Sequence, residues 1–546
     1  MPNIEIDKRE FDNLVGEKIE SERMIEEGSM LGAHWHAIEN NVCDVETYPN
    51  RPDLLSVEGL ARAYRGFFDI ETGRTKYSIE EGEITVSVDN SVEEVRPHIG
   101  SAVVRGLDLS RKKINGLIQL QEKLHETMGR RRDKLAIGLH DLSTIEAPFT
   151  YKAVEPEKVS LTPLEYDSDM DLEEILDRHE KGREYAWILE DEDLYPIIED
   201  DEGVILSFPP IINNQLTEVD ASTEEIFIDV TGKHRETVMK ALNIMATALS
   251  EREGQIESVT VDGEELPDLT PEKMKLDIDY FREISGLELS ADEIVHRLEM
   301  MKHDAKKKND YIRVEIPAYR NDILHQYDLI EEVVIAHRYS NIEPEMPEVD
   351  QIAEKTELQD FVDRVRDVMS SAGALEANTF YLSSTEDLFD KMEKTEDEYA
   401  SVENPSSKDQ QAIRNWLTPS LFQALHDNRH HSYPQSFFEA SEVVKTDDSH
   451  VGASNVMKLA FVKAGKVDYT DARQVLQVFE RDIGVNFILE ASEKEFAEEG
   501  RAADILLNGE QVGFICQYSE DVVENWELDM KASGFELDIS KILEMK

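Results

Sequence analysis

The sequence reads Pro317-Ala-Tyr-Arg-Asn-Asp322-Ile-Leu-His-Gln-Tyr-Asp328-Leu-Ile-Glu331-Glu332 where a predicted β-strand, Ile312 to Ile316, passes into a predicted α-helix. The helix places Asp328, Glu331 and Glu332 at i, i+3 and i+4, so their carboxylates share one face, and a loop can fold Asp322 over it. Four carboxylates at one spot repel one another unless they are neutralised, and all-oxygen ligands suit Mg²⁺. Spacing alone equally allows a solvated acidic helix start with Asp328 as its N-cap.

The residue pattern of this stretch resembles the magnesium-site segment of the beta-subunit family of phenylalanyl-tRNA synthetase, where an acidic cluster follows a Pro-x-x-Arg-x-Asp-Ile run. The resemblance implies that the metal ligands are Asp322, Asp328, Glu331 and Glu332. A second phrase, Asn50-Arg51-Pro52-Asp53-x-x-Ser-x-x-Gly-x-Ala-Arg62, closely resembles the same family near the end of its first domain segment. A turn and an amphipathic helix explain the shape of that phrase and predict Gly66 as a left-handed cap that ends the helix.

The charge of the chain is strongly negative, because 118 acidic residues stand against 58 basic ones and give a formal net charge of -60. Composition alone argues against nucleic acid as a partner, since neutralising phosphates takes Lys and Arg. The acidic residues are spread over every segment, as on proteins of a salt-rich cytosol, where salt screens their mutual repulsion. We therefore interpret the charge as an adaptation to a halophilic habitat and predict low stability in dilute buffer.

No sequence feature indicates a membrane or an export route. No run approaches the ~20 consecutive apolar residues of a bilayer-spanning helix, and the N-terminus lacks the plan of a signal peptide. The only cysteines, Cys43 and Cys516, cannot form a disulfide framework or a Cys-rich zinc site, and we expect both to be buried small hydrophobes. The sequence therefore predicts a cytoplasmic protein without membrane contact.

The densest cationic patch of this acidic chain follows a predicted helix over Ile114 to His125. Arg130, Arg131 and Arg132 are adjacent, and three arginines kept against such a background suggest a contact with phosphate or a nucleotide. The alternative is a helix that continues toward them and is completed by cations at its C-terminus.

The surrounding segment resembles the editing domain of the archaeal and eukaryotic type of the same family, which hydrolyses tyrosine wrongly attached to tRNA for phenylalanine. The matching phrases are Gln121 to His125, Arg130 to Arg132, Ala136 to Asp141, Val204 to Asn214 and Phe227 to Gly232. The resemblance implies two groups of functional residues. The group that binds tRNA or substrate is Gln121, His125, Arg130, Arg131 and Arg132. The editing group is Ser207, Asn213, Asn214, Asp229 and Thr231.

Editing compensates for the limited selectivity of the synthetic site between amino acids that differ by one hydroxyl. An apolar synthetic pocket rejects an analogue with one added hydroxyl only weakly, on the order of 10². A second, polar site that accepts the hydroxyl and hydrolyses the ester restores accuracy. Asp229 is expected at the end of a strand with a buried pattern, where it can orient a water or a ribose hydroxyl. Because no Ser-His-Asp nucleophile is apparent, we expect a positioned water instead of a covalent intermediate.

The last part of the chain resembles the class II synthetase fold, an antiparallel sheet with a helix. The predicted elements include a helix over Leu358 to Ser371 and a strand over Thr379 to Leu382, and the matching phrases are Val402 to Lys408, Ile413 to Leu421, Phe437 to Glu439 and Gly500 to Gly513. Class II sites bind ATP with a late Gly-rich segment that ends in Arg, and no such phrase follows Ala464. We therefore expect a catalytic-like domain without its own synthetic chemistry.

The sequence thus predicts an α+β multidomain protein. Residues 267–345 are expected to form a small winged-helix-like domain, with helices over Ile278 to Ile284 and Ala291 to Met300 and a capping box of Ser290 with Glu293. The other predicted domains are an N-terminal domain over 1–95, completed by about 250–266, an inserted tRNA-editing domain over 96–249, and a class II synthetase-like antiparallel sheet domain over 351–546.

The resemblance also implies a function. This chain would support an alpha subunit that uses ATP to attach phenylalanine to its tRNA, within an α₂β₂ tetramer, and would supply editing and a Mg²⁺ site. One alternative is a stand-alone noncatalytic tRNA-binding protein descended from the same fold. Another is a free-standing Mg²⁺-dependent phosphohydrolase, whose activity would be lost in Asp328→Asn without any partner present.

Overall fold

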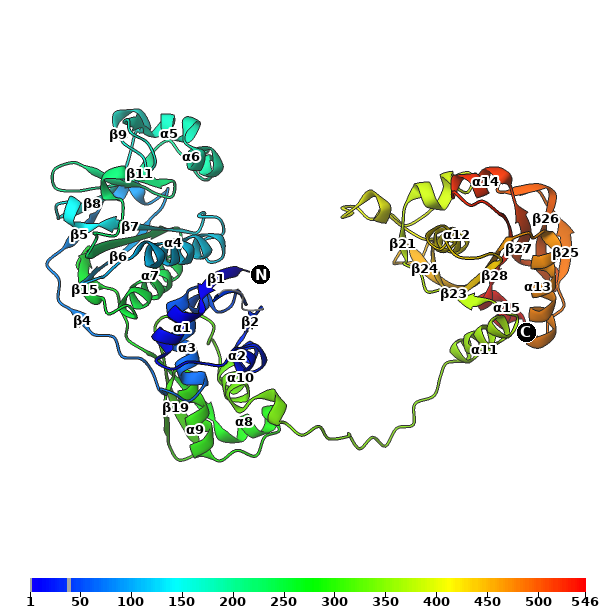
Figure 1. The fold of residues 1–546 in the computed structure, drawn as a ribbon, viewed down its shortest axis with the longest axis horizontal. Coiled ribbons are helices and arrows are strands. Elements are labelled where there is room, and N and C mark those ends of the chain that lie inside the picture. Colours follow the sequence, from blue (N-terminus) through cyan, green and yellow to red (C-terminus); the bar gives the residue numbers. More distant parts are fainter. Residues whose placement is uncertain (1, 37–40) are drawn as a thin grey trace. The chain divides into compact units, whose positions relative to one another are not determined.

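The computed structural model describes residues 2–36 and 41–546, which fall into two units divided between Met346 and Pro347 (Figure 1). Residues 343–356 form neither helix nor strand. The architecture is mixed α and β with several separate sheets, as the sequence predicts at this coarse level. Among the described residues, no helix has both the length and the apolar character that crossing a bilayer requires.

The chain begins with a small three-stranded sheet of order β1-β3-β2. Its strands are β1 (Asn3–Asp7), β2 (Ala33–Trp35) and β3 (Val42–Thr47), and the helices beside it are α1 (Lys8–Val15), α2 (Ser21–Glu26) and α3 (Val57–Phe67). Their core holds an aromatic cluster in which Phe11, Trp35 and Tyr64 meet edge to face. The Trp35 indole donates a hydrogen bond to the Tyr64 hydroxyl (2.7 Å), which satisfies the polar atoms of both buried rings.

One helix ends differently from the sequence expectation. Gly66 lies inside α3, which ends at Phe67 with Phe68 as its C-cap. A Cβ on Gly66 would come within 2.2 Å of the Met300 carbonyl oxygen, so the glycine lets two segments of the chain approach closely. The predicted left-handed cap is therefore wrong, because Gly66 serves packing and not helix termination.

The largest sheet has eleven strands, with the main order β13-β12-β11-β8-β5-β15-β6-β14-β7 and with β16 and β4 both paired to β15. Helix α7 (Arg235–Ser250) packs its apolar side on β6 and β14 over one core. The pairing of β15 with β4, β5 and β6 unites strands from before and after residues 106–254 in one sheet. The bounds are β4 (Ile79–Glu80), β5 (Thr85–Val88), β6 (His98–Arg105), β7 (Leu135–Asp141), β8 (Phe149–Val154), β11 (Tyr195–Glu199), β12 (Ile205–Phe208), β13 (Ile212–Asn213), β14 (Glu225–Gly232), β15 (Gln255–Val261) and β16 (Glu264–Leu266).

Two features complete this part of the chain. Helix α4 (Arg111–Glu126) stands beside β7, and its observed length confirms the predicted helix over Ile114 to His125. A satellite core lies under the pair β9 (Ser160–Leu161) and β10 (Met170–Asp171) with helices α5 (Leu172–Arg178) and α6 (Glu180–Tyr185). These short elements cover one side of the cavity described below.

A third sheet, of order β17-β19-β18, precedes the acidic helix. Helices α8 (Ile278–Ser285) and α9 (Ala291–Met300) confirm the predicted pair, and Ser290 and Glu293 form the predicted capping box. The strands are β17 (Glu272–Asp277), β18 (Asp304–Lys307) and β19 (Tyr311–Ile316), and α10 (Gln326–His337) follows them. Strand β19 thus confirms the predicted strand over Ile312 to Ile316 and leads into residues 317–332.

The second unit is a seven-stranded sheet of order β20-β23-β24-β28-β27-β26-β25, antiparallel except where β20 pairs with β23. Along β24, Leu459 and Phe461 belong to one core, whereas Ala460 and Val462 belong to another, so each face of the sheet is covered by helices. The strands are β20 (Leu375–Glu376), β23 (Gln435–Thr446), β24 (Ala453–Gly465), β25 (Ile488–Ala491), β26 (Ala497–Leu507), β27 (Glu510–Tyr518) and β28 (Lys531–Asp538). The helices are α11 (Glu357–Ser371), α12 (Thr418–Asp427), α13 (Tyr469–Ile483), α14 (Glu520–Asn525) and α15 (Ile539–Met545).

The predicted strand over Thr379 to Leu382 is wrong except at its last residue. Only Leu382–Ser383 form a strand, β21, which pairs with β22 (Ala412–Ile413). The preceding residues are held by side chains instead, since Thr379 Oγ1 donates to Glu439 (2.6 Å) and accepts from Arg414 (2.7 Å). Local β propensity is overridden here by contacts distant in sequence.

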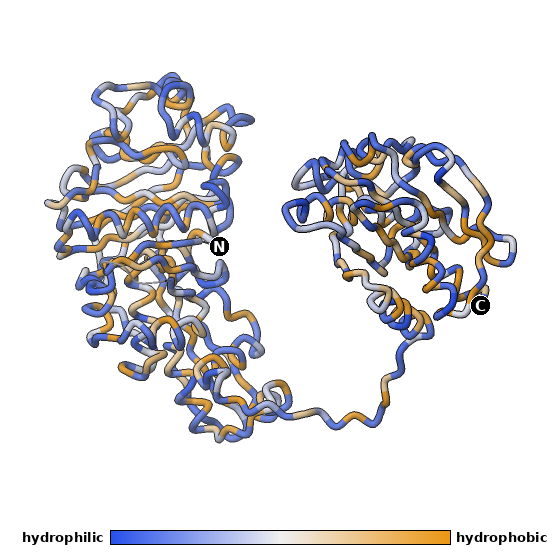
Figure 2. The backbone as a smooth tube through the Cα atoms, turned by 45° about the vertical axis from the view of Figure 1, so that its right-hand side comes forward, coloured by the Kyte–Doolittle hydropathy of each residue, from blue (hydrophilic) through white to orange (hydrophobic). Residues whose placement is uncertain are grey.

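Figure 2 shows hydrophobic and hydrophilic positions alternating along the chain of each unit, as expected where one side of an element is buried and the other is exposed. Cys43 and Cys516 are both buried and unpaired, as predicted.

Candidate active site and carboxylate cluster

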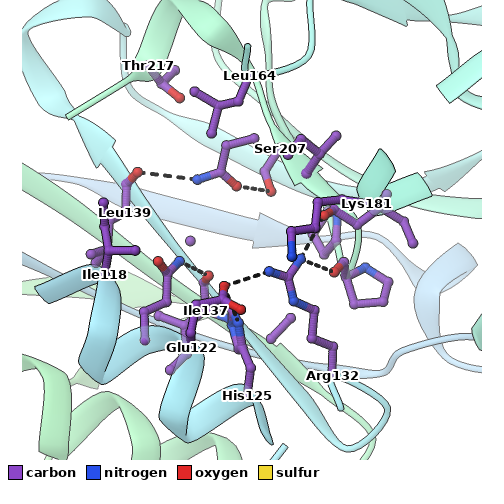
Figure 3. Close-up of a pocket in the computed structure, with 18 of the residues that line it drawn as sticks. Ile118, Glu122, His125, Arg132, Ile137, Leu139, Leu164, Lys181, Ser207 and Thr217 are labelled. Atoms are coloured by element: carbon purple, nitrogen blue, oxygen red, sulfur yellow. Dashed lines mark hydrogen bonds and ion pairs between the residues drawn. The ribbon is translucent and has the colours of Figure 1, made fainter. Parts of the chain in front are cut away.

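A cavity of about 420 Å³ opens between α4, β7, β14 and the β12–β13 connection (Figure 3). Helix α4 lines it with residues spaced at three and four, from Ile114 to His125, so one face of the helix looks into the cavity. Six of the ten predicted functional residues of this segment are among the lining residues: Gln121, His125, Arg132, Ser207, Asn213 and Asp229. The fold therefore brings most of the residues that the sequence analysis predicted for this segment to a single cavity.

Asp229 lies in the middle of β14, directly opposite Gly138 on β7, so its predicted place at a strand end is wrong. Its carboxylate Oδ2 accepts a hydrogen bond from His140 Nε2 (2.8 Å), and His140 Nδ1 lies 2.8 Å from Thr217 Oγ1. All three side chains are buried. Because the carboxylate can only accept, His140 carries its proton on Nε2. The structure thus joins Asp229 to a histidine and a threonine, neither of which the sequence singled out.

A second polar pair lines the cavity at Ser207 and Asn213 (Figure 3). Ser207 Oγ donates to Asn213 Oδ1 (3.2 Å), and Asn213 Nδ2 donates to the Leu139 carbonyl oxygen (3.3 Å). The two side chains come from paired strands, since Ser207 on β12 faces Asn213 on β13. They provide a neutral hydroxyl and amide beside an apolar wall.

On the helix side, Gln121 and His125 both bind the backbone of Ile137. Gln121 Nε2 donates to the Ile137 carbonyl oxygen (2.6 Å), and the Ile137 N–H donates to His125 Nε2 (2.8 Å). An accepting Nε2 places the remaining proton on Nδ1, which lies 3.3 Å from Glu122 Oε1. His125 is thus neutral, consistent with burial, which lowers its pKa below 6.5.

Glu122 joins His125 to Arg132. Arg132 Nη2 donates to Glu122 Oε1 (2.7 Å), and Nη1 donates to the carbonyl oxygens of Ile211 (2.8 Å) and Pro210 (3.3 Å). Burial alone would raise the pKa of Glu122, but the hydrogen bond from His125 and the charge of Arg132 lower it to about 2. Glu122 is therefore an anion that holds one wall of the cavity, and sequence reasoning missed it although it follows Gln121.

The three adjacent arginines do not act as one patch. Helix α4 ends at Glu126, so the predicted continuation of the helix toward them is wrong. Arg130, Arg131 and Arg132 form a left-handed turn with φ of 46°, 57° and 65°. Arg132 is buried against the cavity, whereas Arg130 and Arg131 are exposed.

Two predicted editing residues are not among those that line the cavity. Thr231 is fully buried, and its Oγ1 accepts a hydrogen bond from Arg96 Nε (2.9 Å). Asn214 donates to the Ile205 carbonyl oxygen (2.7 Å) and accepts from the Leu216 N–H (2.9 Å). Both side chains therefore hold the walls of the cavity in place, and neither faces its interior.

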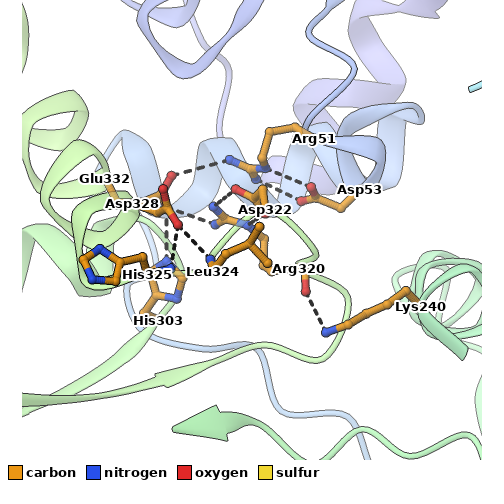
Figure 4. A network of polar contacts seen from close by, with 10 residues as sticks. All are labelled: Arg51, Asp53, Lys240, His303, Arg320, Asp322, Leu324, His325, Asp328 and Glu332. Atoms are coloured by element: carbon orange, nitrogen blue, oxygen red, sulfur yellow. Dashed lines mark hydrogen bonds and ion pairs between the residues drawn. The ribbon is translucent and has the colours of Figure 1, made fainter. Parts of the chain in front are cut away.

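The second cluster surrounds Arg320, which is 2% exposed (Figure 4). Arg320 donates to both oxygens of Asp322 (2.8 and 2.7 Å) and to Glu332 Oε2 (3.0 Å). His303 Nε2 lies 3.1 Å from the same Glu332 oxygen. Burial alone would raise the pKa of Glu332, but Arg320, His303 and Arg51 hold it well below its usual value.

This network also reaches the second quoted phrase of the sequence. Arg51 donates to both oxygens of Asp53 (2.9 Å each), and its Nη1 lies 3.9 Å from Glu332 Oε1. Asp53 and Arg51 are both buried. The two phrases, far apart in the chain, thus form one continuous set of ion pairs.

The other two carboxylates of the predicted metal site differ from these. Asp328 Oδ2 accepts from the N–H groups of Leu324 (2.7 Å) and His325 (2.8 Å), so it completes a capping box in which His325 is the N-cap. The alternative reading of Asp328 as the N-cap is therefore wrong by three positions. Burial and then the charges of Glu332, Asp328 and Asp322 raise the pKa of Glu331.

These contacts test the fit of a magnesium ion. All-oxygen donors suit Mg²⁺, but Arg320 already occupies both oxygens of Asp322 and one of Glu332. Over residues 2–36 and 41–546, no group of three or more His, Cys, Asp or Glu is placed to hold a metal ion. The four carboxylates do not fit a preformed magnesium site in this chain, because arginine supplies the neutralising charge.

Comparisons with known proteins follow the same division of the chain. Residues 342–539 match the family "Phenylalanyl tRNA synthetase beta chain CLM domain", and residues 274–339 match the "tRNA synthetase B5 domain". The chain is 41% identical over 495 residues to the phenylalanine–tRNA ligase beta subunit of Pyrococcus horikoshii, covering 89% of each chain. It is 39% identical over 552 residues to the beta subunit of Methanosarcina barkeri, covering 100% of this chain and 99% of that one.

A solved structure resembles part of this chain. It is an N-terminal fragment of the phenylalanyl-tRNA synthetase beta subunit from Pyrococcus horikoshii, with a TM-score of 0.59 and 40% identity. The match covers 62% of this chain and 99% of the fragment.

Proposed function

Because this chain belongs to the beta-subunit family of phenylalanine–tRNA ligase, we propose that its cavity hydrolyses tyrosine wrongly esterified to tRNA for phenylalanine. Membership makes the chain part of an ATP-dependent ligase complex, with an alpha subunit and tRNA as its partners. The proposal concerns what this chain adds to that complex.

The arrangement of Asp229 supports the proposal most directly. Asp229 lines the cavity, and its hydrogen bond to His140 uses only Oδ2, which leaves Oδ1 for a water molecule. Ser207 and Asn213 lie on another wall and can bind the phenolic hydroxyl that distinguishes tyrosine from phenylalanine. A polar wall of this kind favours the hydroxyl-bearing amino acid, opposite to the selectivity of an apolar synthetic pocket.

The reaction is ester hydrolysis. A water held by Asp229 attacks the carbonyl carbon of the tyrosyl ester, the ester bond to the terminal ribose breaks, and tyrosine and free tRNA leave. The water gives one proton to the departing ribose oxygen, and no covalent enzyme intermediate forms. Thr217 is an unsuitable nucleophile, because its side chain is completely buried and its Oγ1 is held between His140 Nδ1 (2.8 Å) and the Asn214 carbonyl oxygen (3.1 Å).

Gln121, His125 and Arg132 shape the side of the cavity through the Ile137 backbone and the Ile211 carbonyl. Arg130 and Arg131 are exposed beside it, where they can meet the phosphates of the acceptor strand. Thr231 and Asn214 belong to the same machinery as supports for its walls.

The test is deacylation of Tyr-tRNA for phenylalanine by the complex of this chain with its alpha subunit. Asp229→Asn should slow deacylation by on the order of 10²- to 10⁴-fold and leave phenylalanine charging unchanged. Asp200→Asn is the matched control, since Asp200 is a buried carboxylate of the same segment that binds only backbone N–H groups and does not line the cavity. Wild-type deacylation by Asp229→Asn would remove Asp229 from the mechanism.

The finer fold and assembly predictions accompany this proposal. The antiparallel sheet of residues 351–546, covered by helices on both faces, suits a class II synthetase-like domain, and the third sheet with α8, α9 and α10 suits a winged-helix-like domain over 267–345. We assign 1–95 with about 250–266 to the N-terminal domain and 96–249 to the editing domain. The alpha subunit would carry the synthetic site within an α₂β₂ tetramer in the cytoplasm.

Magnesium remains a proposal for the complex and not for this chain alone. Glu331 is exposed and Asp328 is half-buried, and no arginine among the described residues forms an ion pair with either, so they are the ligands most open to an added cation. Asp322 and Glu332 would join them only if Arg320 turned away. Calorimetric Mg²⁺ titration should show no binding to the isolated chain and binding to the complex that Glu331→Gln weakens; equal binding by wild type and Glu331→Gln complexes would exclude Glu331.

A further inference from the structure

Arg96 is the feature of this chain that the proposed function leaves unexplained. The residue is 1% exposed, and over the described part of the chain its guanidinium forms no ion pair with a carboxylate. Burial lowers its pKa to about 10, and the partial compensation comes from Tyr151, Asp133 and Asp229. A buried cation without a paired anion is costly, so its contacts should have a function.

Those contacts join two segments at the cavity. Arg96 Nε donates to Thr231 Oγ1 (2.9 Å) and Nη2 donates to the Thr231 carbonyl oxygen (3.0 Å), which fixes the guanidinium to the end of β14. The same side chain donates to the carbonyl oxygens of Arg132 (3.2 Å) and Asp133 (3.1 Å). Arg96 therefore ties the strand of Asp229 to the turn of the three arginines.

That turn is strained. Arg130, Arg131 and Arg132 are three consecutive L-residues with positive φ, a conformation that brings Cβ too close to the following carbonyl oxygen and that non-glycine residues rarely adopt. Such a backbone persists only where its surroundings hold it, and here the Arg132 N–H also donates to the His125 carbonyl oxygen (3.2 Å). The preceding Gly129 allows this tight return, since a Cβ there would lie 2.6 Å from the same carbonyl oxygen.

The left-handed turn sends its side chains in two directions. Arg132 enters the cavity wall, where it binds Glu122 and lies 4.5 Å over the Tyr185 ring. Arg130 and Arg131 face solvent and form no ion pair with any residue that the structure describes, although acidic residues outnumber basic ones by 118 to 58. Two unpaired exposed arginines on such a chain suit a phosphodiester strand.

We propose that Arg96 is a positioning residue that holds residues 130–132 left-handed, so that Arg132 closes the cavity wall while Arg130 and Arg131 contact the phosphates of the RNA strand entering it. The proposal rests on the proposed editing function for its RNA. It gives Arg132 a role in the cavity wall and Arg130 and Arg131 a role in phosphate contact, whereas the sequence analysis assigns one role to all three.

The experiment uses the complex with the alpha subunit and Tyr-tRNA for phenylalanine. In Arg96→Lys a single ammonium replaces a guanidinium that spans three carbonyl oxygens and one hydroxyl, so the turn should relax and kcat for deacylation should fall on the order of tenfold to a hundredfold. Arg131→Gly alone should keep kcat, raise KM and lower the salt dependence of tRNA binding by about one unit of log–log slope. Arg105→Lys is the matched control, because Arg105 ends β6, the strand that follows Arg96, but pairs with Glu225 and Glu257 away from the cavity.

The double variant Arg96→Lys with Arg131→Gly distinguishes positioning from general destabilisation. Glycine adopts positive φ without strain, so the double variant should recover kcat toward wild type while KM stays raised. A folded Arg96→Lys with wild-type kcat and KM overturns the proposal, and so does a double variant whose kcat stays as low as that of Arg96→Lys.

A readout without editing separates this proposal from the proposed function. Trypsin cuts after arginine only in a chain that can open, so Arg96→Lys should be cut after Arg130 or Arg131 faster than wild type, as read by mass spectrometry. If wild type fails to deacylate but Arg96→Lys is cut faster, the editing function is wrong and the positioning role stands. Equal cleavage of the two proteins overturns the positioning role.

Discussion

Gly138 illustrates how a single residue without a side chain determines the geometry of the cavity. It lies opposite Asp229 on the neighbouring strand, and a Cβ there would come within 1.9 Å of Asp229 Oδ2 and 2.7 Å of His140 Nε2. The carboxylate of Asp229 therefore folds across the space that a side chain at 138 would fill, and it meets His140 there. Glycine is required for close approach here and not for an unusual backbone angle.

This geometry predicts the effect of Gly138→Ala. The added methyl must displace the carboxylate or break its hydrogen bond to His140, so deacylation of Tyr-tRNA should fall by on the order of 10²-fold, while phenylalanine charging by the complex is unchanged. Gly116→Ala on α4 is the control, because a Cβ there meets only Arg252 at 3.7 Å. It should keep deacylation and stabilise the helix by up to about 1 kcal/mol. Unchanged deacylation by Gly138→Ala would contradict the role given to the Asp229–His140 pair.

His125 predicts a pH dependence. Its folded pKa lies below 6.5, so between that folded value and 6.5 the unfolded chain binds a proton that the folded chain does not. This contribution to stability is complete above pH 6.5 and is lost as pH falls through the folded pKa, with a slope of at most about 1.4 kcal/mol per pH unit.

The measurement is thermal unfolding of the chain between neutral pH and mildly acidic pH. His125→Gln can still accept from the Ile137 N–H and donate to Glu122 but cannot titrate, so its unfolding temperature should fall less with pH than that of wild type. His430→Gln, at an exposed histidine, should follow wild type. Identical slopes for wild type and His125→Gln would show that His125 is not protonated on unfolding in this range.

At the scale of elements, the buried ion pairs around Arg320 connect α10 to the segment of Arg51 and Asp53. Such a network is not by itself stabilising, because desolvating its charges offsets their attraction. Removing one partner is different, since it leaves buried carboxylates without a counter-charge. Arg320 is shared by Asp322 and Glu332, so the network depends on it more than on any other member.

Arg320→Met should therefore lower the free energy of unfolding by about 3–5 kcal/mol, measured by chemical denaturation of the full chain. Adding Glu332→Gln removes one of the stranded charges and should recover part of the loss. Arg313→Met is the control, because its pair with Glu315 is exposed and should contribute at most about 1 kcal/mol. Equal decreases in the free energy of unfolding for Arg320→Met and Arg313→Met would mean that the buried ion pairs contribute no more to stability than the exposed pair.

Elements set by local signals were predictable from the sequence. Helix α9 has its predicted bounds because Ser290 and Glu293 form a capping box within four residues. Gly66 and Thr379 were misread because the atoms that decide their structure, Met300 O and Glu439, are distant in sequence. His140 and Arg96 were missed for the same reason, since their partners Asp229 and Thr231 lie 89 and 135 residues away. The resemblance brought Asp229 and Ser207 to attention, but not the contacts that hold them.

For the whole molecule, the net charge of -60 sets the response to salt. Repulsion among like charges favours the unfolded chain, and the screening length falls from about 10 Å at 0.1 M salt to about 3 Å at 1 M. Buried pairs such as Arg320 with Glu332 are screened far less than surface charges. Added salt should thus relieve the repulsion while keeping the internal network.

The unfolding temperature of the chain should therefore rise by several degrees between about 0.1 M and 1 M KCl, where screening reaches contact distances. Sucrose at the same osmolality is the control, because it is excluded from protein surfaces but screens no charge, so it should give a smaller rise. The same repulsion opposes tRNA, whereas Arg130 and Arg131 attract it. Salt weakens both the repulsion of tRNA by the acidic surface and its attraction to the two arginines. The affinity of the wild-type protein for tRNA should therefore fall less steeply with salt than the number of arginine–phosphate contacts alone implies. An unfolding temperature that stays flat or falls across this range would contradict the assignment of the acidic surface to a salt-rich habitat.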